Sequence, residues 1–318
     1  MESPLSQKQV RSVRVFRHTN GGWAPDEDEV VVEEPLEIRL SVAGGGEPFR
    51  TISITMRTPG DDQHLALGFL FTEGIIGCRA DVVRMDQPRR RVGNMVHENT
   101  LDITLRKNLD LDWSSQERHF YTASSCGVCG KGSMELVRQQ SVYLLRPGWP
   151  KVRIEDIQLL PEQLGDSQSV FARTGGLHAA ALVSPDGNVL AAFEDVGRHN
   201  ALDKVIGYAL EENLLPLSNA QIVLSGRIGF ELVQKAWMAG VPVLSAVGAP
   251  SSLAIDLAEE CGMTLIGFVR NNRCNVYAGA ERVKGGKGER GIGRRGDRGK
   301  GRKGDREKGR LGDREKRR

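Results

Sequence analysis

The sequence has no apolar stretch long enough to cross a membrane. No hydrophobic run approaches the roughly 18 residues that a membrane-spanning helix needs. Residues 1–17 contain charges and no apolar segment of the signal-peptide type. We therefore expect a cytoplasmic protein with no membrane partner. Its 318 residues, 39% hydrophobic and 27% charged, are enough for a soluble protein of two domains.

Cysteine is scarce, and its spacing argues against a disulfide framework. The five cysteines are Cys78, Cys126, Cys129, Cys261 and Cys274. An odd number with a single close pair, in a chain of this size, indicates reduced thiols. A structural zinc site usually has a second close pair of ligands, and the sequence has neither that pair nor a His-x-x-x-His motif. The zinc interpretation is therefore disfavoured, and we expect no permanently bound metal.

Acidic residues are outnumbered only in the last segment of the chain. Residues 284–318 hold 16 Lys and Arg against 6 Asp and Glu, whereas residues 1–283 hold 28 against 35. The segment also has 11 glycines and almost no apolar residue, so it cannot bury enough surface to offset the entropy of ordering. We expect a disordered, basic, Gly-rich tail over 284–318. Its charge permits only unspecific contact with nucleic acid, so no specific nucleic-acid partner is expected.

Alternating apolar and polar residues dominate the first third of the chain. This pattern predicts half-buried strands at 12–18, 29–42, 49–56 and 101–105. Between the last two, Asp61 and Asp62 precede closely spaced apolar residues, which predicts an N-capped helix that ends near Gly74. Residues 12–115 are therefore expected to form a small α+β domain.

The region beyond residue 141 has a different pattern. Apolar runs at 178–183 and 188–193 flank Ser-Pro-Asp-Gly, which is a strong β-hairpin signal. Strands and helices then alternate: helices are predicted at 201–212, 229–239 and 252–261, and strands at 221–224, 242–247 and 264–269. Such alternation predicts a parallel sheet flanked by helices, with the hairpin adding antiparallel strands at one side. The fold class is thus α/β, with a mixed sheet over residues 141–283.

The segment that joins the two domains, residues 116–140, holds the close pair of thiols. Cys126 and Cys129 precede Lys131 and a short predicted helix. A thiolate just before a helix start is stabilised by the free N–H groups there, and the lysine adds a positive charge, so at least one thiol is expected to have a lowered pKa. Disulfide exchange and acceptance of a sulfane sulfur as a persulfide both fit such a thiolate.

Three predicted strands end in loops that suit an anion. Ser225–Gly229 and Gly248–Ser252 each leave a strand and open a helix, and Arg270–Arg273 follows the third strand. In open α/β sheets, ligands bind beyond the carboxyl ends of the strands, where helix N-termini offer unpaired N–H groups. Small residues, hydroxyls and arginines there favour a phosphate-bearing ligand, although none of the loops is a Walker loop or a GxGxxG motif.

Glu194–Asn200 is a second concentration of polar residues, and two interpretations of it remain open. Its carboxylates, guanidinium and imidazole are able to bind a ligand or relay protons. Alternatively, Asn200 caps the following helix, Asp203 pairs with Glu194, and His199 is a hydrogen-bonded structural residue.

The other histidines of the two predicted domains are interpreted as structural. His178 begins an apolar strand and is expected to be a satisfied buried histidine. His64 and His97 are expected to be surface or hydrogen-bonded residues.

A set of motifs distributed over residues 12–283 follows a recognisable order. They are Ala66–Ile76, Cys126–Gly130, His178–Ala181, Glu194–His199 with Ala201–Lys204, Glu231 with Gln234 and Lys235, and Leu265–Phe268. In this order the sequence resembles the formate dehydrogenase accessory sulfurtransferases, the FdhD sulfur carriers. The basic tail lies outside the resemblance.

The resemblance implies a specific chemistry. Members of the family take sulfur from a cysteine desulfurase and deliver it to the molybdenum or tungsten bis(molybdopterin guanine dinucleotide) cofactor, which formate dehydrogenase needs in sulfurated form. Cys126 would carry the persulfide, and Cys129 would assist. The C-terminal domain would have a cytidine-deaminase-like fold, and the family tends to form homodimers. Deaminase activity is not implied, because the zinc-binding His-x-Glu and Pro-Cys-x-x-Cys signature is absent.

The sequence therefore predicts a sulfur carrier whose partners are a cysteine desulfurase and formate dehydrogenase. Its candidate cofactor-binding residues are Ser225, Arg227, Ser251 and the loop Phe268, Val269, Arg270, Asn271, Asn272 and Arg273, of which the loop is carried over from the family. Two alternatives remain: a chaperone that binds the cofactor without covalent sulfur chemistry, and a redox enzyme that forms a disulfide between Cys126 and Cys129.

Overall fold

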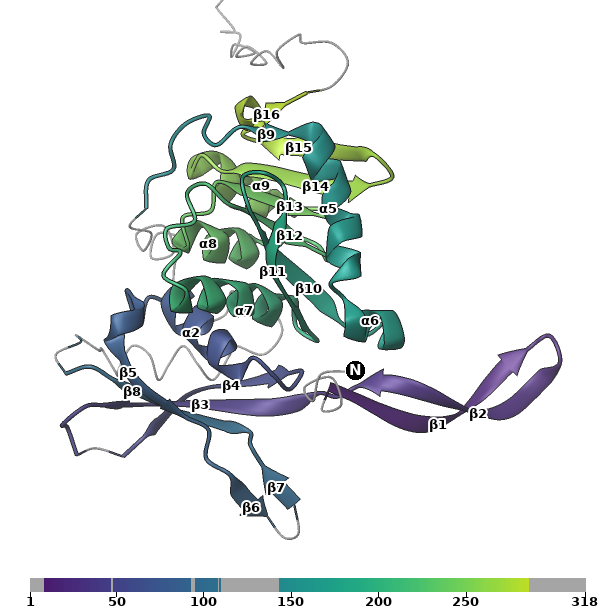
Figure 1. The fold of residues 1–318 in the computed structure, drawn as a ribbon, viewed down its shortest axis with the longest axis vertical. Coiled ribbons are helices and arrows are strands. Elements are labelled where there is room, and N and C mark those ends of the chain that lie inside the picture. Colours follow the sequence, from purple (N-terminus) through teal and green to yellow (C-terminus); the bar gives the residue numbers. More distant parts are fainter. Residues whose placement is uncertain (1–8, 47, 93–94, 108, 110–142, 286–318) are drawn as a thin grey trace, which may run out of the picture.

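The computed structural model describes residues 9–46, 48–92, 95–107, 109 and 143–285. In this part of the chain, helices α2 (Asp62–Thr72) and α7 (Arg198–Glu211) lie between a four-stranded sheet and a six-stranded sheet (Figure 1). Cys126, Cys129, the rest of the segment 116–140 and residues 286–318 lie outside the described residues, and so do the predictions made for them.

The N-terminal strands follow the alternation of the sequence. β1 (Val10–Thr19) and β2 (Gly22–Val31) form an antiparallel hairpin that projects from the body of the molecule (Figure 1). The four-stranded sheet has the order β4-β3-β8-β5, with β3 at Glu34–Val42, β4 at Arg50–Arg57, β5 at Val82–Asp86 and β8 at Thr100–Leu105. The shorter elements nearby are η1 (Arg79–Asp81), β6 (Arg90–Val92) and β7 (Met95–His97). The strands predicted at 12–18, 49–56 and 101–105 are confirmed.

The single strand predicted over 29–42 is wrong. The N–H of Val32 still donates to the carbonyl of Gln9 at 2.8 Å, so the hairpin continues to that point, and the second sheet begins at Glu34. The alternation does not reveal this change of sheet, because both segments have one half-buried face and therefore the same period of two.

The helix predicted after Asp61 is confirmed as α2, but its side-chain cap is not. Asp61 is the N-cap residue with φ 55° and ψ 28°, and its side chain makes no capping hydrogen bond. Asp62 instead accepts hydrogen bonds from Arg57 Nε at 2.9 Å and Gln87 Nε2 at 2.8 Å. The carboxylate that appeared to cap the helix therefore ties its first turn to the sheet below it.

The six-stranded sheet matches the sequence prediction closely. Its order is β11-β10-β12-β13-β14-β15, in which β12, β13 and β14 are parallel and β10, β11 and β15 are antiparallel additions at the two sides. The strands are β10 (His178–Val183), β11 (Val189–Asp195), β12 (Gln221–Leu224), β13 (Val243–Ala246), β14 (Thr264–Arg270) and β15 (Arg273–Ala278).

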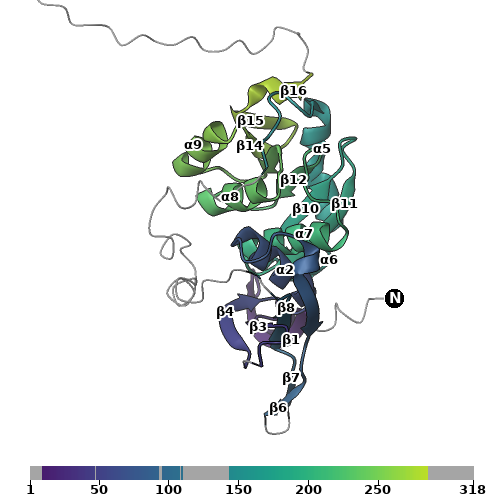
Figure 2. The ribbon, with the colours of Figure 1, turned by 90° about the vertical axis from the view of Figure 1, so that its left-hand side faces the viewer.

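Helices cover both faces of this sheet (Figures 1 and 2). α7, α8 (Phe230–Met238) and α9 (Ser252–Glu260) pack on one face, where Ile222 and Leu224 point. α5 (Ile154–Asp166) packs on the other face, against Val223, and α6 (Ser169–Thr174) follows it. β9 (Val152–Arg153), directly before α5, pairs in parallel with β16 (Val283–Lys284). No helix is predicted from the sequence at α5, which contains Pro161, a residue that disfavours helix interiors.

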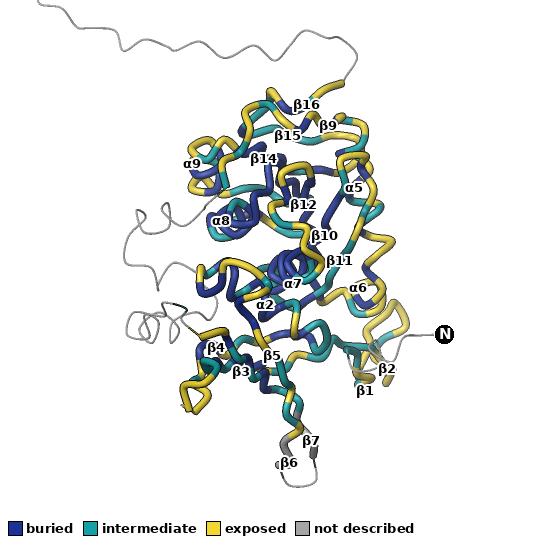
Figure 3. The backbone as a smooth tube through the Cα atoms, turned by 60° about the vertical axis from the view of Figure 1, so that its left-hand side comes forward, coloured by how far each residue is buried: buried dark blue, intermediate teal, exposed yellow. Residues whose placement is uncertain are grey.

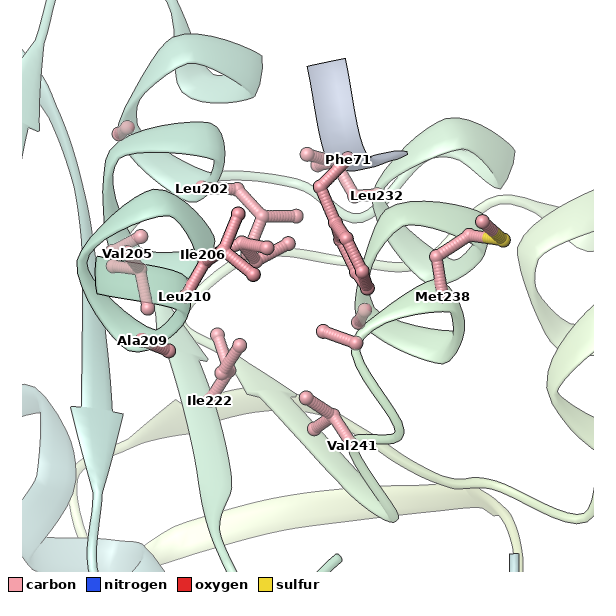
Figure 4. Close-up of a cluster of buried hydrophobic side chains, with 14 of the residues drawn as sticks. Phe71, Leu202, Val205, Ile206, Ala209, Leu210, Ile222, Leu232, Met238 and Val241 are labelled. Atoms are coloured by element: carbon pink, nitrogen blue, oxygen red, sulfur yellow. The ribbon is translucent and has the colours of Figure 1, made fainter. Parts of the chain in front are cut away.

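The two sheets share one hydrophobic core because α2 and α7 touch backbone to backbone. A Cβ at Gly68 would lie 1.9 Å from the carbonyl oxygen of Asp203, and one at Gly207 would lie 1.8 Å from that of His64. In Figure 4, Phe71 of α2 lies beside side chains of α7 and α8. Figure 3 shows α7 as a largely buried helix at the centre of the molecule. The predicted domain boundary near residue 115 stays a prediction.

The surroundings of His64 differ from the surface or hydrogen-bonded position that the sequence predicts. Its Nδ1 is buried and has no hydrogen-bond partner among the described residues, and its ring makes edge contacts with Phe193 and Tyr208 at centroid distances of 5.5 and 5.8 Å. His64 is half-buried and its Nδ1 is not hydrogen-bonded, because the close approach of α2 and α7 places the ring among aromatic side chains. The side chain of His97 lies outside the described residues.

Candidate functional site

The loops that leave β12 and β13 lie side by side. The N–H of Gly248 donates to the carbonyl of Gly226 at 3.1 Å, and the N–H of Ser251 donates to that of Ile228 at 2.9 Å. A Cβ at Gly248 would lie only 2.6 Å from the carbonyl oxygen of Gly226. The glycine is therefore required for the two loops to come together beyond the ends of their strands.

The third parallel strand reaches the same place. The N–H of Phe268 donates to the carbonyl of Gly248 at 3.0 Å, and Phe268 has a positive φ of 54° that interrupts the regular pairing of β14. The guanidinium of Arg270 lies over the Phe268 ring, 5.7 Å from its centroid. The three strand ends predicted to suit an anion thus form one continuous surface, which we call the strand-end surface.

The predicted binding residues contribute to this surface unequally. Arg227 and Arg270 are exposed. Ser225 Oγ accepts a hydrogen bond from the N–H of Ala179 at 2.8 Å, and Ser251 Oγ caps α9 by accepting one from the N–H of Ala254 at 3.3 Å. Each hydroxyl keeps its own hydrogen for donation to a ligand. Val269 is fully buried in a cluster with residues of α5 and β13, so its side chain cannot reach a ligand at the surface.

The loop Arg270–Arg273, unlike the loops after β12 and β13, does not lead into a helix. Arg270 pairs with Arg273 in a tight hairpin between β14 and β15, and Asn271 and Asn272 take positive φ values of 52° and 56°. Asparagine tolerates this left-handed conformation better than most residues. The two exposed arginines therefore offer charge and side-chain donors, without free N–H groups of a helix start.

The polar loop at 194–200 is built around Asp195, which is fully buried. Its carboxylate lies 2.8 Å from Lys204 Nζ and accepts hydrogen bonds from Asn200 Nδ2 at 2.9 Å and the N–H groups of Thr58 and Gly197. The N-cap residue of α7 is Gly197, so the prediction that Asn200 caps this helix is wrong. Asn200 instead ties the start of α7 to strand β4, by donating to the carbonyl of Met56 at 2.8 Å.

The predicted pairing of Asp203 with Glu194 is also wrong. Glu194 accepts hydrogen bonds from the N–H groups of Val170 and Phe171 at the start of α6. Asp203 lies on α7, about one helical turn after Asn200, and its side chain points to α8. Both of its carboxylate oxygens are 2.9 Å from Lys235 Nζ. Burial alone would lower the pKa of Lys235, but the attraction of Asp203 and Glu73 outweighs it and raises that pKa. The ammonium is held charged in the shared core.

A group of cationic side chains lies next to the strand-end surface. His178, predicted to be a satisfied buried histidine, is half-buried, and a Cβ at Gly226 would lie 3.2 Å from its Nδ1. Burial, followed by the charges of Arg198, His199 and Arg227, lowers the pKa of His178. These three residues come from the start of α7 and the loop after β12, so the fold gathers positive charge that the linear sequence distributes over 50 residues.

His199 has a carboxylate partner. Its Nε2 lies 3.0 Å from Glu231 Oε2 on the first turn of α8. Burial opposes ionisation of Glu231, but the hydrogen bond from His199 and the nearby cations lower its pKa below the ordinary value. The hydrogen bond expected for His199 is therefore confirmed, and its side chain is 33% exposed, so both interpretations of this residue stay open.

Two of the cysteines in the described part of the chain have raised pKa values, and no metal cluster is found there. Burial raises the pKa of the Cys261 thiol to about 11 and also raises that of Cys274. No group of three or more His, Cys, Asp or Glu side chains in the described ranges is arranged to hold a metal ion. No helix there is long and apolar enough to span a membrane. Cys261 and Cys274 are therefore poor candidates for thiolate chemistry.

The known proteins that this chain resembles agree on one family. The model of the FdhD/NarQ family matches residues 31–284. The "Sulfur carrier protein FdhD" of Mycolicibacterium paratuberculosis is 50% identical over 278 residues, covering 86% of this chain and 99% of that protein. The protein of the same name from Streptomyces coelicolor is 48% identical over 273 residues, covering 85% and 94%. A crystal structure of a formate dehydrogenase accessory protein from Desulfotalea psychrophila has the same fold, with a TM-score of 0.65 at 22% identity, covering 87% of this chain and all of that one.

Proposed function

The chain belongs to the FdhD/NarQ family, and on this basis we propose that it is a sulfur carrier that supplies sulfur to the cofactor of formate dehydrogenase. The observation that carries the proposal is the identity of about half of all residues, over most of both chains, with proteins named sulfur carriers. Its finer points are that Cys126 carries the sulfur, that a cysteine desulfurase donates it, and that the acceptor is molybdenum or tungsten bis(molybdopterin guanine dinucleotide).

The first chemical step is a transfer between thiols. The thiolate of Cys126 attacks the outer sulfur of the persulfide on the desulfurase, a new S–S bond forms at Cys126, and the desulfurase cysteine leaves as a thiolate. No net oxidation occurs. The lowered pKa expected from the sequence around Cys126 serves both the attack and the later release.

The second step delivers the outer sulfur to the metal of the cofactor, which is a substrate here. The S–S bond at Cys126 breaks, Cys126 returns to a thiol, and the sulfur becomes a sulfide on the metal. Sulfide formation consumes two electrons, which we assign to the metal, passing from oxidation state four to six. In this cycle Cys126 is regenerated, so the chain acts as a sulfurtransferase.

The strand-end surface supports the proposal that a phosphorylated cofactor is the acceptor. Arg227, Arg270 and Arg273 are exposed there, and Ser225 and Ser251 present hydroxyls beside them. Guanidinium groups bind phosphate oxygens in pairs, and small loop residues let a large ligand approach the backbone. We propose that this surface holds the nucleotide part of the cofactor during transfer.

The decisive test is sulfur loading of the full chain. Incubation with a cysteine desulfurase and L-cysteine, followed by alkylation and mass spectrometry, is expected to show one added sulfur on the peptide that contains Cys126. Cys126→Ser should abolish this addition and leave formate dehydrogenase assembled but inactive in cells. Cys78→Ser, at an exposed cysteine of the N-terminal part, is the matched control and should change neither result.

The two alternatives predict different outcomes of the same test. A chaperone without covalent sulfur chemistry would keep full function in the Cys126→Ser variant and lose it in Arg270→Gln. A dithiol redox enzyme would yield a reversible disulfide between Cys126 and Cys129 and depend equally on both. Full formate dehydrogenase activity with Cys126→Ser would eliminate the persulfide role.

A further inference from the structure

We propose that the solvent-facing side of helix α5 binds the basic tail of the same chain. The exposed residues on this side are Glu155, Leu159, Glu162 and Asp166, and we call them the α5 outer face. Its occupant is the segment 286–318, which follows the last strand, β16. The contact does not depend on the sulfur chemistry proposed above, because α5 lies outside the strand-end surface.

The α5 outer face is exposed and acidic. Its members are spaced by four, three and four positions, so they form one stripe along the helix. α5 contains no Lys or Arg, and Arg153, directly before it, pairs with Asp156 at 2.6 Å. Among the described residues, neither Glu162 nor Asp166 forms an ion pair. These two carboxylates therefore leave negative charge on the face that the described cations do not balance.

The tail carries the complementary charge in a regular pattern. Residues 284–318 hold 16 Lys and Arg against 6 Asp and Glu. From residue 288 onward a pattern recurs every eight residues, in which a glycine is followed by an acidic residue and an arginine, at Gly288, Gly296, Gly304 and Gly312. In each of these four units Lys and Arg outnumber Asp and Glu. The positive charge is thus distributed along the tail, which suits a row of carboxylates better than a single anion.

The tail begins beside the α5 outer face. β16 pairs in parallel with β9, which directly precedes α5 (Figure 1). A Cβ at Gly285, the last described residue, would lie 2.6 Å from Glu155 Oε2. α5 has 13 residues and is therefore about 20 Å long. A flexible Gly-rich chain of the tail's length has an end-to-end distance of about 30 Å, so the tail is able to reach every carboxylate of the face.

The covalent link compensates for weak individual contacts. Exposed ion pairs stabilise little on their own and are screened by salt. Because both partners belong to one chain, the concentration of the tail beside α5 is roughly millimolar or higher. Docking should therefore be reversible, require several ion pairs at once and end at high salt.

Carbodiimide coupling of the full chain tests where the tail docks. The reagent joins a lysine amine to a carboxylate in contact with it, and mass spectrometry identifies the joined peptides. We expect the tail residues Lys287, Lys300 and Lys303 to couple to the α5 outer face, and this coupling to be lost near 1 M salt, where the screening length is about 3 Å. The internal comparison is α9 on the other face of the sheet, which exposes Asp256, Glu259 and Glu260.

Binding of a labelled DNA oligonucleotide tests whether docking withholds the tail from other anions. The triple variant Glu155→Gln, Glu162→Gln and Asp166→Asn should bind DNA about threefold more tightly if the tail is docked about two-thirds of the time. The matched control is the triple variant of α9, Asp256→Asn, Glu259→Gln and Glu260→Gln, which changes the net charge equally and should leave the affinity unchanged. Circular dichroism establishes that both variants are folded.

Three results would overturn the proposal. The first is coupling of the tail to α9 or to the β1–β2 hairpin as often as to α5. The second is equal DNA affinity of the two triple variants. The third is coupling between different copies in a mixture of isotope-labelled and unlabelled chains, which would assign the α5 outer face to the tail of a second copy. Sulfur loading of Cys126 should be the same in all variants, so the proposed function is tested separately.

Discussion

At the scale of single residues, His178 shows how neighbours decide the state of a side chain. Its imidazole is half-buried beside Gly226, and the charged groups that act on it are Arg198, His199, Arg227 and Asp195. Burial, followed by electrostatic interaction with Arg198, His199 and Arg227, lowers the pKa of His178, and Asp195 opposes this effect. The imidazole is therefore neutral at neutral pH and able to act as both donor and acceptor.

This lowered pKa predicts a pH dependence of stability. In the folded protein the pKa of His178 lies below its ordinary value of 6.5, so the unfolded chain binds more protons as the pH falls through that value. The free energy of unfolding should therefore decrease below about pH 6.5 and level off once the pH is under the folded pKa. Urea unfolding at several pH values should show a smaller decrease for His178→Gln than for the unmodified chain.

At the scale of elements, the crossing of α2 and α7 depends on two glycines. Gly68 and Gly207 allow the helix backbones to touch, and an added methyl group at either would overlap a carbonyl oxygen of the other helix. Each of these helices also forms an ion pair with another element. Asp62 of α2 pairs with Arg57 of β4, and Asp203 of α7 pairs with Lys235 of α8. The contact between α2 and α7 thus connects the two sheets.

Substitution of Gly68 by alanine tests this contact. Overpacking typically costs about 1–3 kcal/mol, and we expect at least about 2 kcal/mol here because the obstacle is backbone and cannot rotate away. Gly165→Ala is the matched control, since Gly165 is also helical but has no atom within 4 Å of the added Cβ. Gly165→Ala should stabilise the chain by about 0.5–1 kcal/mol, the ordinary gain in a helix. Equal effects of the two substitutions in urea unfolding would contradict the close crossing.

The elements that the sequence predicted are those with a strong local period. The β10–β11 hairpin and the alternation from β12 to β14 were found because each strand is a short apolar run bounded by turn residues. The sequence does not indicate α5, and its alternation predicts one strand over residues 29–42, where the structure has two. In both cases the local pattern is ambiguous. α5 contains an internal proline, and the alternation over residues 29–42 continues across the change from one sheet to the next.

At the scale of the whole molecule, the core formed by the described residues extends to Val283. The last residues of the described chain that pack in it are Ala278 and Val283, and the family match ends at residue 284. A chain that ends at Gly285 should therefore have the same free energy of unfolding as the full chain, as measured by urea unfolding. Its unspecific, salt-dependent binding to DNA should be weaker, because the removed residues carry a large excess of Lys and Arg. A stability loss above about 1 kcal/mol would show that the tail contributes to the fold.

The sequence by itself determined the α/β class, the alternation of strands and helices along the C-terminal half, the pair of thiols and the family. Each of these depends on local period or on motif order, which the linear chain records directly. Only the tertiary structure revealed that three strand ends meet at Gly226, Gly248 and Phe268, and that Val269 faces the core. It also brought His178, Arg198 and Arg227 together and assigned Asp203 to Lys235. Such contacts join residues far apart in sequence, and they are set by how helices and sheets pack, which no local pattern contains.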